Sequence, residues 1–286
     1  MDNRTVVHTA RRLLLALAIL CLTAYGGGLL WLVANETRIV FDAGRPLGKA
    51  RPAAPFEQIE LPRNDGARQV AFKLPRGAEA EDSPWVLYLH GNGATIGSRV
   101  NVSRCDQLRA LGLNALAPEY RGYGGLDGVP SEATVADDAR VGYEYLRTGL
   151  RVPAERIVIY GWSLGAAVAV HLASTVPSGA VILEGAPASL VAIGQRRYPY
   201  VPIRLLMRNP FEAILRIGHV RAPILFLHSP EDAVIPIEEG KRLFEAAHPP
   251  KTFVEIRGGH IDSSDEDAAA FYGAIRRFLI RANLLH

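Results

Sequence analysis

The residues best suited to chemistry lie in the pentapeptide 161–165, Gly-Trp-Ser-Leu-Gly, which fits the pattern G-x-S-x-G. Residues 157–160 before it are β-branched or aromatic, and residues 166–170 after it are apolar, which is typical of a strand and a buried helix. A strand, a tight turn and a helix around such a serine predict a nucleophile elbow, because this turn lifts the hydroxyl above the sheet. A chance match is the alternative, but chance matches rarely fall between a strand and a helix. We therefore predict that Ser163 is a nucleophile.

A serine hydroxyl needs a neutral histidine to take its proton, and that histidine needs a carboxylate to orient it. In the chain order serine, acid, histidine, both partners follow later strands. Asp232 follows the apolar run 223–228, and His260 follows the run 253–256 and a pair of glycines. We predict Asp232 as the acid and His260 as the base. Glu231 and Glu184 are the alternative acids.

A developing oxyanion needs two backbone N–H donors. Leu164, directly after the serine, offers one at the start of its helix, where the helix dipole also favours negative charge. The loop 90–93, His-Gly-Asn-Gly, follows an apolar strand and offers the second, with Asn92 as the predicted donor. An ordinary glycine-rich turn is the alternative for this loop, which lacks the features of a phosphate-binding motif.

The pattern of apolar runs predicts an α/β fold with a doubly wound, mostly parallel sheet of eight strands, because strands alternate with helices over most of the chain. The predicted strands are residues 57–61, 68–74, 85–89, 114–118, 157–160, 180–183, 223–227 and 253–256. The predicted helices are residues 99–111, 131–146, the helix after Ser163, and 265–281. Together they predict a single α/β domain over residues 56–286.

One interval interrupts the alternation of strands and helices. Residues 188–221 lie between two predicted strands and carry a proline-rich lead-in followed by an amphipathic stretch. The interval is long for a plain crossover, so we predict a small cap over the active site. An ordinary crossover helix is the alternative.

The N-terminal part contains 22 residues without a charge, 13–34, which is long enough to cross a bilayer. We predict a tail (1–12), a transmembrane anchor (13–34) and a linker (35–55). A cleaved signal peptide and a lipoprotein-type cleavage before Cys21 are alternatives, but the residues at both kinds of site fit poorly. Basic residues lie on both sides of the segment; the pair Arg11 and Arg12 favours an N-terminus inside and the globular part across the membrane.

Composition limits the class of partner. The chain has 286 residues, 49% hydrophobic and 21% charged, with a net charge of +3 and both signs interspersed. Such a charge distribution predicts no basic patch of the kind that binds nucleic acid. The two cysteines, Cys21 and Cys105, imply no disulfide framework, and no Cys/His cluster has metal-ligand spacing. We expect no cofactor and no metal, and the oligomeric state is left open.

Together these motifs resemble the α/β-hydrolase superfamily, and within it the membrane-anchored serine hydrolases that include eukaryotic lysophospholipases and protein depalmitoylases. The resemblance covers about residues 68–282 and rests on segments 90–93, 120–124, 130–132, 161–165, 223–236 and 258–260. It implies a triad of Ser163, Asp232 and His260. The chain departs from the family pattern at Gly185, where a serine is frequent, and at Ser229, where a glycine is common.

These features predict a membrane-anchored serine hydrolase that cleaves carboxylic esters or thioesters of acyl chains, with a lipid as a candidate substrate. The alternative, from another class, is a catalytically inactive scaffold that binds a lipid or protein partner.

Overall fold

The computed structural model describes residues 3–63, 65–77 and 83–286. These residues form one sheet of eight strands in the order β1-β2-β4-β3-β5-β6-β7-β8. The strands are β1 Glu57–Glu60, β2 Val70–Leu74, β3 Trp85–Leu89, β4 Asn114–Pro118, β5 Ile157–Trp162, β6 Ala180–Glu184, β7 Ile224–His228 and β8 Lys251–Glu255. The pairs β1–β2 and β2–β4 are antiparallel and the other pairs are parallel. The predicted doubly wound sheet is confirmed, and each strand begins and ends within two residues of its prediction.

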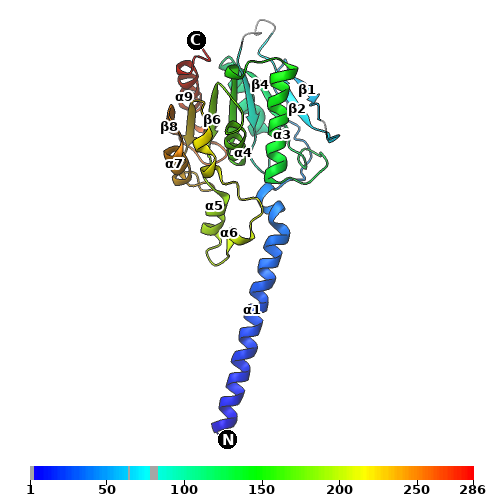
Figure 1. Cartoon of the computed structure of the whole chain (residues 1–286), viewed down its shortest axis with the longest axis vertical. Helices are drawn as coiled ribbons and strands as arrows, with labels where there is room; N and C mark the ends of the chain where they lie inside the picture. The colour runs from blue at the N-terminus through cyan, green and yellow to red at the C-terminus, as the bar shows by residue number, and fades with distance from the viewer. Residues whose placement is uncertain (1–2, 64, 78–82) are drawn as a thin grey trace.

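The central strands are apolar throughout because helices cover both faces of the sheet (Figure 1). Along β3, for example, Leu87 belongs to one apolar cluster and Val86 and Tyr88 to the other. One face packs against α3 Glu132–Glu144, α4 Leu164–Ala173 and α7 Ile237–Ala246, and the other against α2 Arg99–Ala110 and α9 Ala268–Arg281. The predicted closing helix is interrupted: α8 Ser263–Glu266 ends before Asp267, whose side chain then caps α9 by accepting a hydrogen bond from the backbone of Ala270.

Helix α1 runs from Asn3 to Phe41 and extends away from the rest of the molecule as a single long rod (Figure 1). It contains one stretch long and apolar enough to cross a membrane. The predicted tail begins with residues 1 and 2, which lie outside the described residues, and the remainder of that tail is helical.

The prediction of a linker over 35–55 needs correction. Residues 35–41 continue α1, and Phe41 is completely buried in the core, where its ring lies 5.9 Å from that of Phe211. The carboxylate of Glu36 explains why the helix continues here. It accepts hydrogen bonds from the backbone and side chain of Arg208 (2.8 and 2.7 Å) and of Asn209 (2.8 and 3.1 Å), so the last turns of α1 are attached to the domain.

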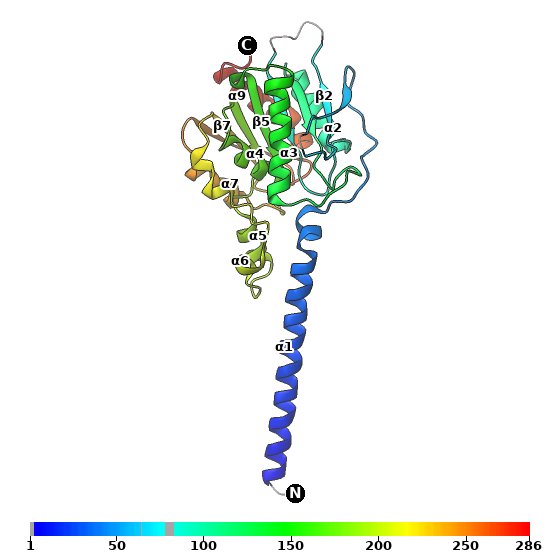
Figure 2. The same cartoon turned by 45° about the vertical axis from the view of Figure 1, so that its right-hand side comes forward.

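Residues 188–221, which we call the cap segment, contain two α-helices, α5 Leu190–Arg197 and α6 Ile203–Leu206, and two short 3-10 turns, Ala213–Leu215 and Ile217–His219. Helices α5 and α6 project from the body of the domain on the side from which α1 leaves (Figures 1 and 2). They do not lie along the sheet as a crossover helix does.

Candidate active site

Ser163 occupies the sharp turn between β5 and α4, with φ 56° and ψ −122°. The two flanking glycines make this turn possible. A Cβ at residue 161 would lie 2.2 Å from the carbonyl oxygen of Gly165, and a Cβ at residue 165 would lie 2.1 Å from that of Leu89. Any larger residue would therefore force the strand and the helix apart, and the serine would lose its position.

His260 joins Ser163 to Asp232. Its Nε2 lies 2.7 Å from Ser163 Oγ and its Nδ1 lies 2.6 Å from Asp232 Oδ2. An ionised carboxylate only accepts hydrogen bonds, so Nδ1 carries the proton and Nε2 is free to accept one from the serine hydroxyl. The structure thus brings together the three residues predicted from the sequence, in an arrangement that can activate a hydroxyl for nucleophilic attack.

The surroundings of Asp232 keep its carboxylate ionised. Burial by itself would raise the pKa of Asp232. The hydrogen bond from His260, with backbone N–H donors at Ile235 (2.8 Å) and Val234 (2.9 Å), outweighs burial and lowers this pKa below its ordinary value. Glu231, the alternative beside it, is exposed. Ser229, one of the departures from the family pattern, accepts a hydrogen bond from the Glu231 backbone and shapes this loop.

Glu184, the other alternative acid, lies on a different network. Its carboxylate makes a bidentate ion pair with buried Arg104 (2.7 and 3.0 Å) and accepts hydrogen bonds from Tyr160 and Ser263. Burial opposes the charge on Glu184, but Arg104 outweighs it and the pKa of Glu184 is lowered. Arg104 also donates to the carbonyl of Ile261 (3.2 Å), so the pair fixes the loop that carries the histidine.

Gly185, the other departure, lies against the triad with φ +54°. A Cβ here would lie 3.3 Å from His260 Cε1 and 3.4 Å from Asp232 Oδ2. Glycine at this position both allows the left-handed backbone and leaves room for the imidazole.

The two predicted oxyanion donors, Asn92 and Leu164, line the same cavity as Ser163, which has a volume of about 250 Å³. The loop of Asn92 approaches the serine closely, since a Cβ at Gly91 would lie 3.2 Å from the Cβ of Ser163. The side chain of Asn92 is engaged elsewhere, donating to the carbonyl of Val40 (3.1 Å). Its backbone N–H is therefore the group to consider as the second donor, beside that of Leu164 at the first turn of α4.

Below this loop, His90 is completely buried and both of its ring nitrogens face oxygen atoms. Nδ1 lies 2.7 Å from the carbonyl of Gly91, and Nε2 lies 2.8 Å from Glu119 Oε1. The other carboxylate oxygen of Glu119 accepts from the backbone of Ile96 (3.0 Å). The sequence drew attention to the glycines of this loop, whereas its position also depends on the His90–Glu119 pair.

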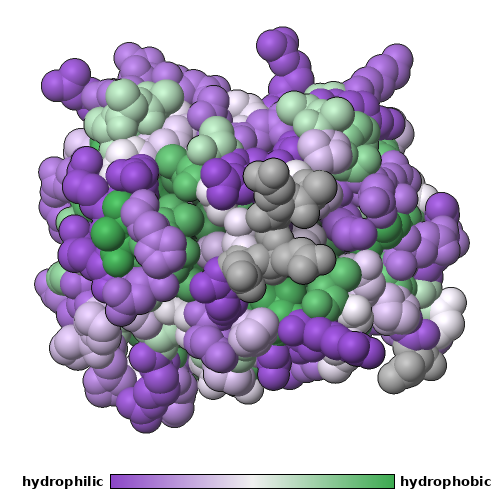
Figure 3. All heavy atoms as spheres, turned by 90° about the horizontal axis from the view of Figure 1, so that it is seen from above, coloured by the Kyte–Doolittle hydropathy of each residue, from purple (hydrophilic) through white to green (hydrophobic). Residues whose placement is uncertain are grey.

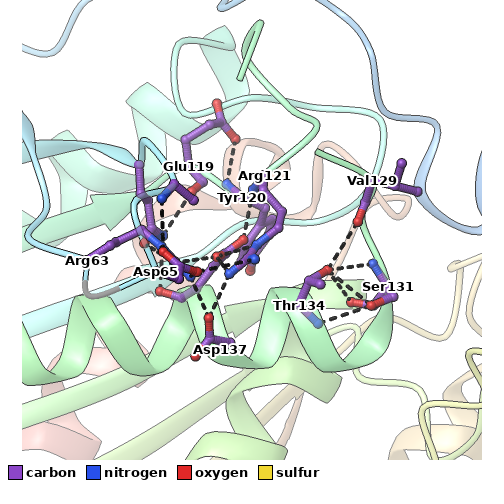
Figure 4. Close-up of polar contacts among 12 residues, drawn as sticks. Arg63, Asp65, Glu119, Tyr120, Arg121, Val129, Ser131, Thr134 and Asp137 are labelled. Atoms are coloured by element: carbon purple, nitrogen blue, oxygen red, sulfur yellow. Dashed lines mark hydrogen bonds and ion pairs between the residues drawn. The ribbon is translucent and has the colours of Figure 1, made fainter. Parts of the chain in front are cut away.

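A charged cluster lies close to Glu119 in the chain and is drawn in Figure 4. Arg121, two residues after Glu119, binds Asp137 (2.7 Å) and Asp138 (2.8 Å) on α3. Arg63 binds the same two carboxylates (2.6 and 2.8 Å). These ion pairs attach the loop after β4 to α3. Because that loop carries Glu119, the ion pairs support the site indirectly, by holding the loop, and do not themselves touch the triad.

Two further histidines lie outside the triad. His228 Nε2 donates to the carbonyl of Ile235 (2.9 Å) and lies 3.7 Å from Asp232 Oδ2, so it supports the acid loop from below. Burial lowers the pKa of His228. His171 on α4 lines cavities that do not include Ser163, and its pKa is lowered by burial and by the charges of Arg216 and Arg140. Within the described residues no group of three or more His, Cys, Asp or Glu side chains could hold a metal ion.

Helix α1 also contributes to this site, which was not predicted from the sequence. The cavity beside Ser163 is lined by Ile39 and Val40 of α1 and by several residues of the cap segment, namely Leu190, Ile193, Gly194, Arg197, Tyr198 and Met207. Helix and loop are also joined by a hydrogen bond from the backbone of Gly93 to the carbonyl of Phe41 (3.1 Å). The only local signal was the apolar triplet 39–41 inside the predicted linker.

The fold and this constellation define a member of the α/β-hydrolase family, and the chain belongs to it. The family described as "Alpha/beta hydrolase family" matches residues 86–213. The chain is 35% identical to "Uncharacterized protein Rv2307c" of Mycobacterium tuberculosis over 96% of this chain and 97% of that protein. It is 30% identical to "Lysophosphatidylserine lipase ABHD12" of Danio rerio over 60% of this chain and 52% of that protein. The solved esterase Pf2001 of Pyrococcus furiosus has a similar fold, with a TM-score of 0.68 and 19% identity over 83% of this chain and 98% of that chain.

Proposed function

We propose that the protein is a membrane-anchored serine hydrolase that cleaves carboxylic esters or thioesters of acyl chains through an acyl-enzyme. The observation that carries this proposal is the hydrogen-bonded series Ser163–His260–Asp232, with distances of 2.7 and 2.6 Å, at a strained turn that lines a cavity. The family to which the chain belongs supports hydrolysis as the general activity.

In the proposed reaction, His260 Nε2 takes the proton of Ser163 Oγ as the oxygen attacks the acyl carbonyl. Asp232 stabilises the resulting imidazolium, and the backbone N–H groups of Asn92 and Leu164 hold the oxyanion. The imidazolium then gives its proton to the departing alcohol or thiol. Water, deprotonated by the same histidine, attacks the acyl-enzyme and releases the carboxylic acid.

The character of the cavity supports an acyl chain as the group bound beside Ser163. Most of the described lining residues are apolar, and among them Arg197 alone carries a charge. Apolar lining favours an alkyl chain because its burial releases water from both surfaces. The lipase named among the relatives acts on lysophosphatidylserine, which supports lipid esters as the first compounds to test.

The N-terminal helix is compatible with membrane association. We propose that α1 crosses the membrane once, with its N-terminus in the cytoplasm and the hydrolase domain on the far side. Fusions of a reporter that folds only outside the cytoplasm, placed after His286, test this orientation. Activity of the reporter supports it, and a silent reporter on an expressed fusion contradicts it.

Labelling by a fluorophosphonate probe tests the proposed chemistry. The detergent-solubilised wild type should be labelled, and Ser163→Ala should not. The same substitution should lower turnover of a matched ester by roughly 10⁶-fold, as when a triad nucleophile is removed. A panel of p-nitrophenyl esters from acetate to palmitate, run beside lysophospholipids and acyl thioesters, then defines the substrate. Well-folded wild type that is not labelled and hydrolyses none of these compounds would favour the inactive scaffold.

A further inference from the structure

Two cavities adjoin each other between α1 and the cap segment. One lies beside Ser163; the second has a volume of about 100 Å³ and lies farther along α1. The two cavities share five of their lining residues, Ile39, Val40, Gly194, Tyr198 and Met207. Because they share these residues, the cavities form one groove that begins at the serine and continues along the helix. Among the described residues that line the second cavity, Glu36 alone is charged, and its carboxylate is already bound by Arg208 and Asn209.

The side of α1 that faces this groove is a continuous stripe. Leu32, Val33, Glu36, Ile39 and Val40 recur every three or four residues, so they share one face of the helix. From Val40 to Leu32 the stripe covers about 12 Å along the helix axis, at 1.5 Å per residue. The groove thus leads from Ser163 down to the uncharged segment 13–34 that is expected to lie in the membrane.

The tip of the cap segment, residues 198–206, reaches still farther along the helix. The hydroxyl of Tyr25 donates to the carbonyl of Tyr200 (2.6 Å). Tyr25 precedes Ala34 by nine residues, or about 13 Å of helix, which is within one leaflet of a hydrocarbon core about 30 Å thick. The tip therefore lies beside the part of α1 that one leaflet would surround.

The surface of this tip suits a lipid leaflet. Tyr200 and Leu205, both on this tip, are 88% and 82% exposed, and exposed apolar side chains grouped in this way mark surfaces that contact a membrane or a partner. Residues 190–207 contain three arginines and no acidic residue, so they attract anionic headgroups. The opposite end of the molecule is different: seen from there, most of the surface is hydrophilic (Figure 3).

We infer that the acyl chain of a bilayer lipid reaches Ser163 sideways, through the groove between α1 and the cap segment, while the tip of that segment inserts into the same leaflet. This inference rests on the proposed function and adds the source and route of its substrate. It makes α1 a wall of the acyl-binding site as well as an anchor. A long chain fills the groove beside Leu32 and Val33, whereas a short acyl group occupies only the cavity at the serine.

Val33→Trp, which fills the groove, tests the route. Its matched control is Leu30→Trp on the same helix, at a position that is 73% exposed and outside the groove. Each protein is reconstituted in phosphatidylcholine vesicles and assayed on p-nitrophenyl palmitate and p-nitrophenyl butyrate. We expect Val33→Trp to lower kcat/KM for palmitate by at least about tenfold, since each methylene kept out of the groove loses about fourfold in binding. Hydrolysis of butyrate by Val33→Trp should fall much less than that of palmitate, and both activities of Leu30→Trp should match those of the wild type.

Equal loss on both esters, or no loss on either, would overturn the inference. Fluorophosphonate labelling of each variant shows whether it is folded with a reactive Ser163, and a wild type that is neither labelled nor active would count against the proposed function instead.

A second pair of variants tests the insertion of the tip: Leu205→Asp should weaken hydrolysis of vesicle-borne palmitate but not of butyrate. Leu215→Asp, at a position 72% exposed and away from the tip, is its control. Equal behaviour of these two variants would contradict insertion.

Discussion

The side-chain amide of Asn92 donates a hydrogen bond to the carbonyl of Val40, 3.1 Å away and 52 residues earlier in the chain. Together with the bond from Gly93 to Phe41, it attaches the loop beside Ser163 to the last turn of α1. The carbonyls at a helix C-terminus lack partners within the helix, so they are available to hold a loop in this way. The position of a proposed oxyanion donor thus depends on the N-terminal helix.

Asn92→Ala should lower kcat/KM about fivefold on esters of any chain length. The substitution keeps the backbone N–H but removes the bond to Val40, which is worth about 1 kcal/mol. Steady-state assays on butyrate and palmitate esters measure the effect. Asn35→Ala is the control, because Asn35 makes a similar amide-to-carbonyl bond, to Trp31 (2.9 Å), away from the serine. An Asn92→Ala enzyme as active as this control contradicts the prediction.

Gly185→Ala should lower kcat as well as stability. A side chain at φ +54° costs about 1–2 kcal/mol of backbone strain, and the added Cβ presses on His260 and Asp232 at 3.3 and 3.4 Å. Gly125→Ala separates the two effects, because Gly125 has φ +80° and no atom within 4 Å of the added Cβ. Thermal unfolding should show a loss for both variants, and only Gly185→Ala should lose turnover. A similar loss of turnover in both variants would contradict the prediction that a side chain at residue 185 lowers kcat by contacting the triad.

Arg104→Met should destabilise the protein by about 3–5 kcal/mol, because it leaves the buried carboxylate of Glu184 without its ion partner. The double substitution Arg104→Met/Glu184→Leu should cost less, since it removes both charges. Denaturant unfolding of the three proteins measures the difference. The expectation is wrong if the double variant is less stable than Arg104→Met.

Stability should decrease in acid in two pH ranges. Burial lowers the pKa of His228, so the unfolded chain binds a proton more readily than the folded one; stability is lost as the pH falls below about 6.5. The pKa of Glu184 and that of Asp232 are also lowered, so a second loss begins below about pH 4.

Thermal unfolding from pH 8 to pH 3 measures both losses. His228→Gln keeps an N–H donor for the carbonyl of Ile235 and should reduce the first loss while leaving the second. His171, whose pKa is lowered too, accounts for what remains of the first. An unchanged profile in His228→Gln would show that this ring does not set the first range.

The sequence allowed the sheet and the candidate triad to be predicted because both leave local signals. Continuous apolar runs mark strands covered on both faces, and the turn at Ser163 requires glycines at fixed spacing. The chain order of acid and histidine then selected Asp232 and His260. In the structure His260 lies 2.7 Å from Ser163 and 2.6 Å from Asp232.

The contribution of α1 left only one weak local signal, the apolar triplet 39–41. Glu36 ends the uncharged segment, so residues 35–41 looked like the start of a linker. Whether they are helical depends on Arg208 and Asn209, more than 170 residues later in the chain. The Arg104–Glu184 pair, 80 residues apart, is similarly invisible to spacing. Contacts of this kind follow from the finished packing and not from local pattern.

The attachment at Glu36 has a mechanical consequence. A flexible tether would let the hydrolase domain tumble and sample substrates at many heights above a membrane. Helix α1 instead passes without interruption into the core at Phe41, so the domain stands on a rigid support. In the proposed orientation, the nucleophile is kept at one height and one tilt relative to the lipid surface, and the geometry of its encounter with a lipid is set before any substrate arrives.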